Sequence, residues 1–266
     1  MMSEFVVQLD GRAATEAELG PLAFAGYAHF TAMQVRGGGV RGLDLHLERL
    51  RNASAEMFGR AIPDERIRAL LRTALADGPD DVSLTATVFG AAGEFTAADV
   101  EPRVLVRTGP PASGPAGPLA LAAVEHERDL PAVKHVGEVG KTYHLRRAVA
   151  RGFDDAAFVD RRRRFSEGTI WNLAFWDGSA VVWPRAAMLA GTTMGIVRRR
   201  LGALGVVQRD AEVTLDDVPD LAGAVVMNSW TPGVAVHRIE DAKLPDARDF
   251  LALLHRAHGD EPLTSP

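Results

Sequence analysis

The segment GPPASGPAGP, residues Gly109 to Pro118, decides how this chain is organised. Its ten residues include four prolines and three glycines, a composition that cannot sustain a helix or a central strand. We therefore predict an interdomain linker at 109–118, a small α/β domain at 1–108 and a larger domain at 119–266.

Hydrophobic periodicity on both sides of the linker predicts strands and helices that are interspersed without strict alternation. The strands are expected at 5–8, 28–34, 40–43, 82–89, 103–107, 119–124, 156–159, 172–176, 180–182 and 224–227, and the helices near 44–58, 63–75, 142–151, 194–204 and 247–257. This order favours an α+β fold with mixed sheets over a doubly wound fold.

Composition excludes several classes of function. The net charge of −5 gives no support for nucleic acid or an anionic membrane as the main partner. The absence of cysteine excludes disulfides, thiolate nucleophiles and cysteine metal sites, and the eight histidines lack metal-ligand spacing. We find neither a signal peptide nor an apolar run of ~18 residues, so we expect a cytoplasmic protein without a metal.

The run Arg161 to Arg164 is interpreted as a solvated hairpin turn.

Lysine is scarce in this chain. Of its 30 basic residues only Lys134, Lys141 and Lys243 are lysines, so arginine serves wherever a plain positive charge is sufficient. Arginine cannot replace a lysine that bonds covalently to a carbonyl, because its guanidinium stays protonated. A lysine in this sequence is therefore a stronger functional candidate than usual.

Four short motifs carry the chemistry: DLHLERL at 44–50, Lys134-His135, SEGTIWN at 166–172 and LAGTT at 189–193. In this order and spacing they resemble the fold-type IV pyridoxal-phosphate enzymes, a family that includes branched-chain aminotransferases, D-amino acid aminotransferases and aminodeoxychorismate lyases. The resemblance extends from about Tyr27 to about Ile239. It implies a two-domain fold whose larger domain binds the cofactor, a small-molecule amino substrate and a homodimer.

The resemblance also implies a role for each motif. Lys134 matches the lysine that carries pyridoxal 5′-phosphate and moves the proton between the substrate Cα and C4′ of the cofactor. Glu167 matches the carboxylate that keeps the pyridine nitrogen protonated. The implied phosphate-binding residues combine cationic, hydroxyl and helix N-terminal donors, and they are Arg49, Gly191, Thr192, Thr193 and Ser229.

Three functions stay open at this point. The leading hypothesis is an aminotransferase that moves an amino group from an amino acid to a 2-oxo acid. The alternative is a lyase-like elimination that releases pyruvate, because Lys134-His135 and the Phe30-Thr31-Ala32 stretch resemble the lyases equally well. A non-catalytic family member is the third, because the strand around Thr85 lacks the arginine with which relatives often bind the substrate carboxylate.

Lys141 competes with Lys134 for the cofactor, since Tyr143 follows it as a tyrosine follows the lysine of branched-chain enzymes. In the family, however, the lysine precedes a helix that ends just before a glycine- and acid-containing turn. Counting back from that turn, which starts at Gly152, over a helix of family length leads to Lys134. We therefore favour Lys134, and we expect Lys141 to be a solvated lysine at the start of the helix.

Overall fold

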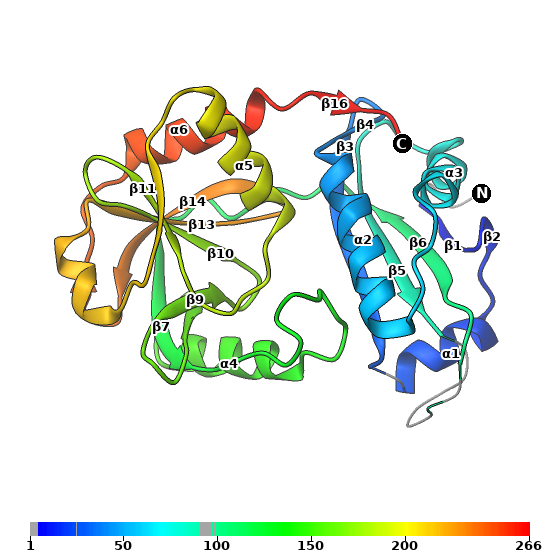
Figure 1. Cartoon of the computed structure of the whole chain (residues 1–266), viewed down its shortest axis with the longest axis horizontal. Coiled ribbons are helices and arrows are strands. Elements are labelled where there is room, and N and C mark those ends of the chain that lie inside the picture. Colours follow the sequence, from blue (N-terminus) through cyan, green and yellow to red (C-terminus); the bar gives the residue numbers. More distant parts are fainter. Residues whose placement is uncertain (1–4, 25, 91–96, 98) are drawn as a thin grey trace. The chain divides into compact units, whose positions relative to one another are not determined.

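The computed structural model describes residues 5–24, 26–90, 97 and 99–266, which form two compact units (Figure 1). Unit 1 comprises 1–112, 133–137 and 262–266, and unit 2 comprises 113–132 and 138–261. The first change of unit follows Ala112, inside the segment 109–118. The chain then returns to unit 1 twice, at 133–137 and at 262–266.

Unit 1 is built on an antiparallel sheet with the strand order β16-β4-β3-β5-β6-β1-β2. Its strands are β1 (Val7–Leu9), β2 (Arg12–Ala13), β3 (Ala28–Arg36), β4 (Gly39–Arg41), β5 (Val82–Phe89), β6 (Arg103–Gly109) and β16 (Leu263–Thr264), and its helices are α1 (Glu16–Phe24), α2 (Leu43–Phe58) and α3 (Asp64–Leu75). Alternation along each strand turns every second side chain to one face.

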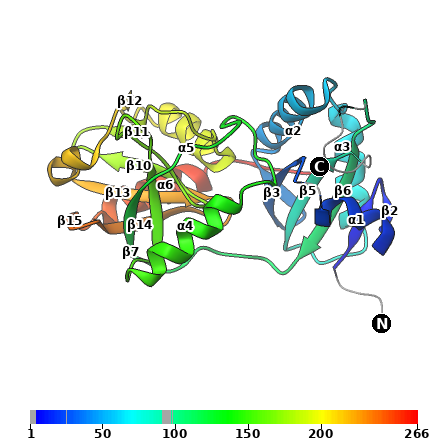
Figure 2. The same ribbon diagram turned by 90° about the horizontal axis from the view of Figure 1, so that it is seen from below.

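Helices α2 and α3 cover one face of this sheet (Figure 2). Leu47 of α2 and Leu71 of α3 pack there with Leu84 of β5 and Val106 of β6. Helix α1 covers part of the opposite face, where Leu22 packs in a second cluster. The two faces therefore differ, because α2 and α3 cover one of them and the shorter α1 covers only the end of the other.

Unit 2 is built on a mixed sheet with the strand order β12-β11-β10-β13-β14-β7-β8-β9. Its strands are β7 (Leu119–Glu125), β8 (Asp155–Val159), β9 (Phe165–Gly168), β10 (Asn172–Trp176), β11 (Val181–Pro184), β12 (Gln208–Ala211), β13 (Gly223–Asn228), β14 (Thr231–Ile239) and β15 (Ala242–Lys243), and its helices are α4 (Val139–Ala150), α5 (Thr192–Ala203), α6 (Arg248–Gly259) and the 3₁₀ helix Leu215–Asp220. Strand β9 also pairs with β10, through Glu167 and Asn172. The strands from β10 to β9 in this order therefore close into a ring.

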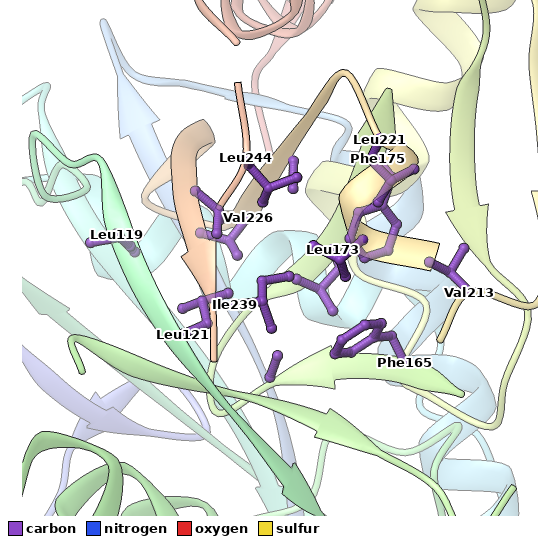
Figure 3. Close-up of a cluster of buried hydrophobic side chains, with 14 of the residues drawn as sticks. Leu119, Leu121, Phe165, Leu173, Phe175, Val213, Leu221, Val226, Ile239 and Leu244 are labelled. Atoms are coloured by element: carbon purple, nitrogen blue, oxygen red, sulfur yellow. The ribbon is translucent and has the colours of Figure 1, made fainter. Parts of the chain in front are cut away.

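The ring encloses the main core of unit 2. Figure 3 shows part of this cluster, with Leu121 of β7, Phe165 of β9, Leu173 of β10 and Val226 of β13 among its labelled side chains. Residues that alternate with them pack outward against α5 and α6, while α4 packs on β7 and β8. The predicted α+β class is confirmed, although only the sheet of unit 2 mixes parallel and antiparallel pairs.

The helices and strands agree with the predicted ones to within a few residues, with some omissions. Strands β5 and β10 have the predicted bounds, while α4 and α5 begin earlier, at Val139 and Thr192. Helix α1 was not predicted, because Gly20 and Pro21 interrupt its pattern. Within the described residues, no helix has both the length and the apolar character needed to cross a bilayer.

Candidate active site

Glu167 lies on β9, a four-residue strand whose residues are all buried. A hairpin turn precedes this strand. Asp160 stabilises the turn by accepting hydrogen bonds from the backbone N–H groups of Arg162 and Arg164, both at 2.9 Å. Arg164 also pairs with Asp160 and with Glu212. The run of four arginines is thus the β8–β9 turn, held by carboxylates.

The segment after Glu167 is anchored by a buried aspartate. Asp155 accepts hydrogen bonds from Thr169 Oγ1 at 2.5 Å and from Trp171 Nε1 at 2.8 Å. Burial raises the pKa of Asp155, and these hydrogen bonds oppose the effect. Because this anchor fixes 169–171, it also fixes the point at which β9 and β10 meet.

Two cations and a second carboxylate surround Glu167. Arg128 Nη1 lies 3.3 Å from one carboxylate oxygen of Glu167, and Lys141 Nζ lies 3.4 Å from the other. Glu138 pairs with the same two cations, at 3.0 Å from Lys141 Nζ. The side chains of Glu167 and Arg128 are only 4% and 3% exposed, so this charge-balanced group lies inside unit 2.

The expectation that Lys141 is a solvated lysine is therefore wrong. Lys141 lies in the first turn of α4 as expected, but the residue is only 9% exposed. It is buried because α4 begins at Val139, which places its side chain beside Glu138 and Glu167. Sequence reasoning found no role for Arg128 or Glu138, since neither belongs to a recognisable motif.

Gly191, Thr192 and Thr193 form the start of α5. Gly191 is the N-cap in an extended conformation, and no side chain caps this helix end. The first backbone N–H groups of any helix lack partners within it and carry a partial positive charge. Since the first turn contains no acidic residue, this end of α5 can receive an anion.

The β13–β14 turn is held against this helix end. The Thr193 hydroxyl donates to the Asn228 carbonyl at 2.8 Å, and Ser229 is the next residue in the turn. The hydroxyl of Thr193 is therefore used inside unit 2, which leaves its backbone N–H as the donor for a ligand. Trp230 follows Ser229 and meets Trp171 edge to face, with ring centroids 6.2 Å apart.

Asn172 connects the acid to the helix end, and sequence reasoning assigned it no role. It pairs with Glu167 across β9 and β10, and its Nδ2 donates to the Leu189 carbonyl at 2.7 Å. A Cβ at Gly191 would lie 1.9 Å from Asn172 Oδ1, so only glycine fits beside it. Unit 2 thus brings Glu167, the α5 start and, through the Thr193 contact with Asn228, Ser229 into one contiguous region.

The other two predicted residues belong to unit 1. Arg49 is half-buried on α2, near the buried His46, whose ring Nδ1 lies 2.6 Å from Thr31 Oγ1. Burial, with a smaller contribution from the Arg49 charge, lowers the pKa of His46 to about 3. His46 is therefore neutral near pH 7 and does not repel the positive charge of Arg49.

Lys134 lies on a short extended segment that pairs with the edge of β3. Its carbonyl accepts a hydrogen bond from Phe30 N at 2.8 Å, and His135 bridges His29. Its Nζ lies 4.8 Å from the centre of the Phe30 ring.

The part of the chain that the structure describes contains no cluster of three or more His, Asp or Glu that could hold a metal ion.

Three solved structures with this fold illustrate its relatives. A candidate 4-amino-4-deoxychorismate lyase from Legionella pneumophila has 18% identity and a TM-score of 0.80, covering 92% of this chain and 95% of its own. The branched-chain aminotransferase of Thermoproteus uzoniensis, solved with norvaline, has 19% identity and a TM-score of 0.80, covering 97% and 98%. A hypothetical aminotransferase from Mycobacterium tuberculosis in its pyridoxal-phosphate-bound form has 22% identity and a TM-score of 0.78, covering 95% and 98%.

No curated protein matches the chain significantly. At such low identities the solved structures establish the fold alone. The family model for class IV aminotransferases, however, matches residues 28–239, which is most of the chain. The chain therefore belongs to the class IV aminotransferases, a family of pyridoxal-phosphate-dependent enzymes.

Proposed function

We propose that this protein is an aminotransferase that moves an amino group between an amino acid and a 2-oxo acid, with pyridoxal 5′-phosphate as its cofactor. The observation that carries the proposal is the contiguous arrangement in unit 2. There a buried carboxylate, Glu167, is joined through Asn172 to a helix N-terminus at Gly191 that lacks a capping side chain.

The residues present fit this cofactor. A protonated pyridine nitrogen needs a nearby carboxylate, and Glu167 is a buried one. A phosphate needs backbone and hydroxyl donors, and the α5 start with Ser229 offers both. When bound, pyridoxal phosphate supplies the electron sink that makes a substrate Cα–H acidic.

Each residue then has one task. Lys134 would hold the cofactor and move the proton at the substrate Cα, while Glu167 would accept a hydrogen bond from the pyridine nitrogen. Gly191, Thr192 and Thr193 donate backbone N–H groups to the phosphate, and Ser229 donates its hydroxyl. Arg49 would supply a cation for the cofactor phosphate.

Lys141 is the less suitable lysine for attachment. Its Nζ is engaged with Glu138 at 3.0 Å and with Glu167 at 3.4 Å, and both ion pairs would have to break before it could attack a carbonyl. Lys134 Nζ lies 4.8 Å from the centre of the Phe30 ring. We therefore assign Lys141 to positioning Glu167.

A lyase-like elimination that releases pyruvate is the second candidate. Lys134-His135 supports it as a motif, and the Legionella pneumophila structure supports it as a fold relative. We further propose that the protein is a cytoplasmic homodimer. Light scattering would measure the mass of the dimer.

The test is the visible absorption spectrum of the purified protein before and after borohydride, followed by peptide mapping. We expect a cofactor band that borohydride bleaches and a pyridoxyl adduct on the Lys134 peptide. An adduct on the Lys141 peptide would overturn the lysine assignment, and the absence of any cofactor band after incubation with pyridoxal phosphate would overturn the function.

Mixing with a panel of amino acids then separates the two reactions. An aminotransferase converts the cofactor to its pyridoxamine form and returns it when a 2-oxo acid is added. A lyase releases pyruvate without an acceptor. A protein that holds the cofactor and does neither is the non-catalytic family member.

A further inference from the structure

The sheet of unit 1 has one face that its helices leave partly open. Leu84, Ala86 and Val88 of β5 are buried in the core under α2 and α3. Ser83, Thr85 and Thr87 alternate with them and are only half-buried, so they lie on the opposite face. This open face carries hydroxyl groups where a covered face would carry apolar side chains.

Both ends of the open face are filled by the protein itself. At one end Phe89 and Ala28 pack with Leu22 of α1. At the other end Gln34 is hydrogen-bonded to Ser83 and to Arg36, whose guanidinium also donates to the Ala112 carbonyl at 3.0 Å. The middle of the face, from Phe30 to Arg107, lies between these two ends.

The register places a specific set of side chains across this middle. Ala32 of β3 pairs with Thr85 of β5, and Thr85 pairs with Arg107 of β6. Two residues along, Phe30 pairs with Thr87. Arg107 shares the face of Thr85 because its neighbours in sequence, Val106 and Thr108, are buried on the other side.

Arg107 lies on this face, and the described residues give its guanidinium no hydrogen bond or ion pair. Arg103 is bound to Asp10 at 2.8 Å and lies 3.4 Å from Glu18, and Arg36 is occupied as described above. The Arg107 guanidinium is exposed, and it makes no hydrogen bond or ion pair with any residue that the structure describes. Strands β3 and β5 lie between the segment of Lys134 and the strand of Arg107, and the exposed Arg107 is thus available to an anion.

We propose that Arg107, with the Thr85 hydroxyl beside it, binds a carboxylate of the substrate. The planar guanidinium matches the two carboxylate oxygens with two parallel N–H donors, and the hydroxyl adds a third donor. This assignment supplies the arginine that the β5 sequence lacks, from the neighbouring strand. It rests on the proposed function, in which Lys134 moves the proton at the Cα of the same substrate.

The spacing of the sheet is compatible with this role. Two strand separations and two residues along the strand put the Cα atoms of Phe30 and Arg107 roughly 12 Å apart. Lys134 Nζ lies over the Phe30 ring at the near end of that interval. The long side chains of Lys134 and Arg107 can therefore approach the two ends of one small molecule.

The test is calorimetric titration of the protein loaded with pyridoxal phosphate, so its readout is binding and not turnover. The probes are propionate, 4-methylpentanoate and glutarate, together with the neutral 4-methylpentanamide. The variants are Arg107→Met and Arg107→Lys, and the control is Arg66→Met, an exposed arginine on α3 that lies 3.7 Å from Asp10 and 3.9 Å from Glu101.

We expect wild type and Arg66→Met to bind at least one carboxylate, and to bind the amide at least tenfold more weakly than the corresponding acid. Arg107→Met should lose about 10- to 100-fold in carboxylate affinity, as expected for a charge-assisted hydrogen bond, and Arg107→Lys should be intermediate. Because Arg107 is exposed, the melting temperature and the cofactor content should stay at the wild-type values.

Three outcomes would overturn the inference: equal carboxylate affinity in Arg107→Met and wild type, equal affinity for acid and amide, or no carboxylate binding by loaded wild type. All three require a protein that holds its cofactor. A wild type that binds no pyridoxal phosphate would instead overturn the proposed function, so the two failures are distinguishable.

Discussion

Adding a single methyl group at Gly191 tests how the start of α5 is held. The backbone there is ordinary extended, with φ −64° and ψ 142°, so alanine incurs no backbone strain. The new Cβ would nevertheless lie 1.9 Å from Oδ1 and 3.0 Å from Cγ of Asn172. Asn172 is buried, so it has to move, and its 2.7 Å hydrogen bond to the Leu189 carbonyl has to break.

Two costs follow from that displacement. Forcing a methyl group into a filled site costs about 1–3 kcal/mol, and leaving a buried amide unpaired costs about 1–3 kcal/mol more. We therefore expect Gly191→Ala to lower the free energy of unfolding of unit 2 by about 2–6 kcal/mol. Gly202, on the same helix, is the matched control, because a Cβ there meets only Gln208 Nε2 at 3.8 Å.

Urea denaturation followed by tryptophan fluorescence measures the effect, since all four tryptophans lie in unit 2. Gly202→Ala should be as stable as wild type or more stable, by ~0.5–1 kcal/mol. If Asn172 causes the clash, replacing it with alanine removes the clash, and Gly191→Ala should then cost little further stability in the Asn172→Ala background. A full further loss would show that Asn172 is not the cause. Equal stability of Gly191→Ala and Gly202→Ala would refute the packing described here.

Glu167→Gln should keep the cofactor but lose most turnover, because an amide cannot stabilise a protonated pyridine nitrogen; unchanged steady-state activity would remove Glu167 from the site. Arg49→Ala should weaken pyridoxal phosphate binding to the apoprotein by roughly 1–3 kcal/mol, whereas Thr193→Ser keeps its hydroxyl bond and should bind as wild type does. Buried His46, whose pKa is about 3 in the fold, takes up a proton on unfolding below about pH 6.5, so the free energy of unfolding should fall as the pH falls. The expected loss is about 2 kcal/mol between pH 7.5 and 5, and an unaltered pH slope in His46→Gln would contradict it.

The helices and strands that sequence patterns predicted are those with a strong period. Strand β5, with its alternation of buried and half-buried residues, has the predicted bounds, and so does the buried strand β10. Strand β9 was missed because four residues are too few for a period to emerge. The class was predictable because the order of the long elements alone determines it.

The environment of each site residue was less predictable than its identity. Glu167 stands out in a motif, but its partners Arg128, Glu138 and Lys141 come from separate segments that only the folded ring brings together. Asn172 lies within the quoted SEGTIWN motif, yet nothing in the sequence says that its side chain reaches the Leu189 carbonyl. Arg107 could not be connected to Thr85, because strand register is a long-range property.

The two returns of the chain to unit 1 have a consequence for its biosynthesis. Residues 262–266 pair with β4 through Leu263 and Thr264, and residues 133–137 pair with β3. Ribosomal elongation at about 5–20 residues per second separates the emergence of residue 112 from that of residue 262 by roughly 8–30 s. During that interval the sheet of unit 1 exposes the unpaired edge of β4, which is the kind of edge that recruits other chains. A chaperone that shields this edge would therefore act on the nascent chain until Leu263 and Thr264 emerge and pair with β4.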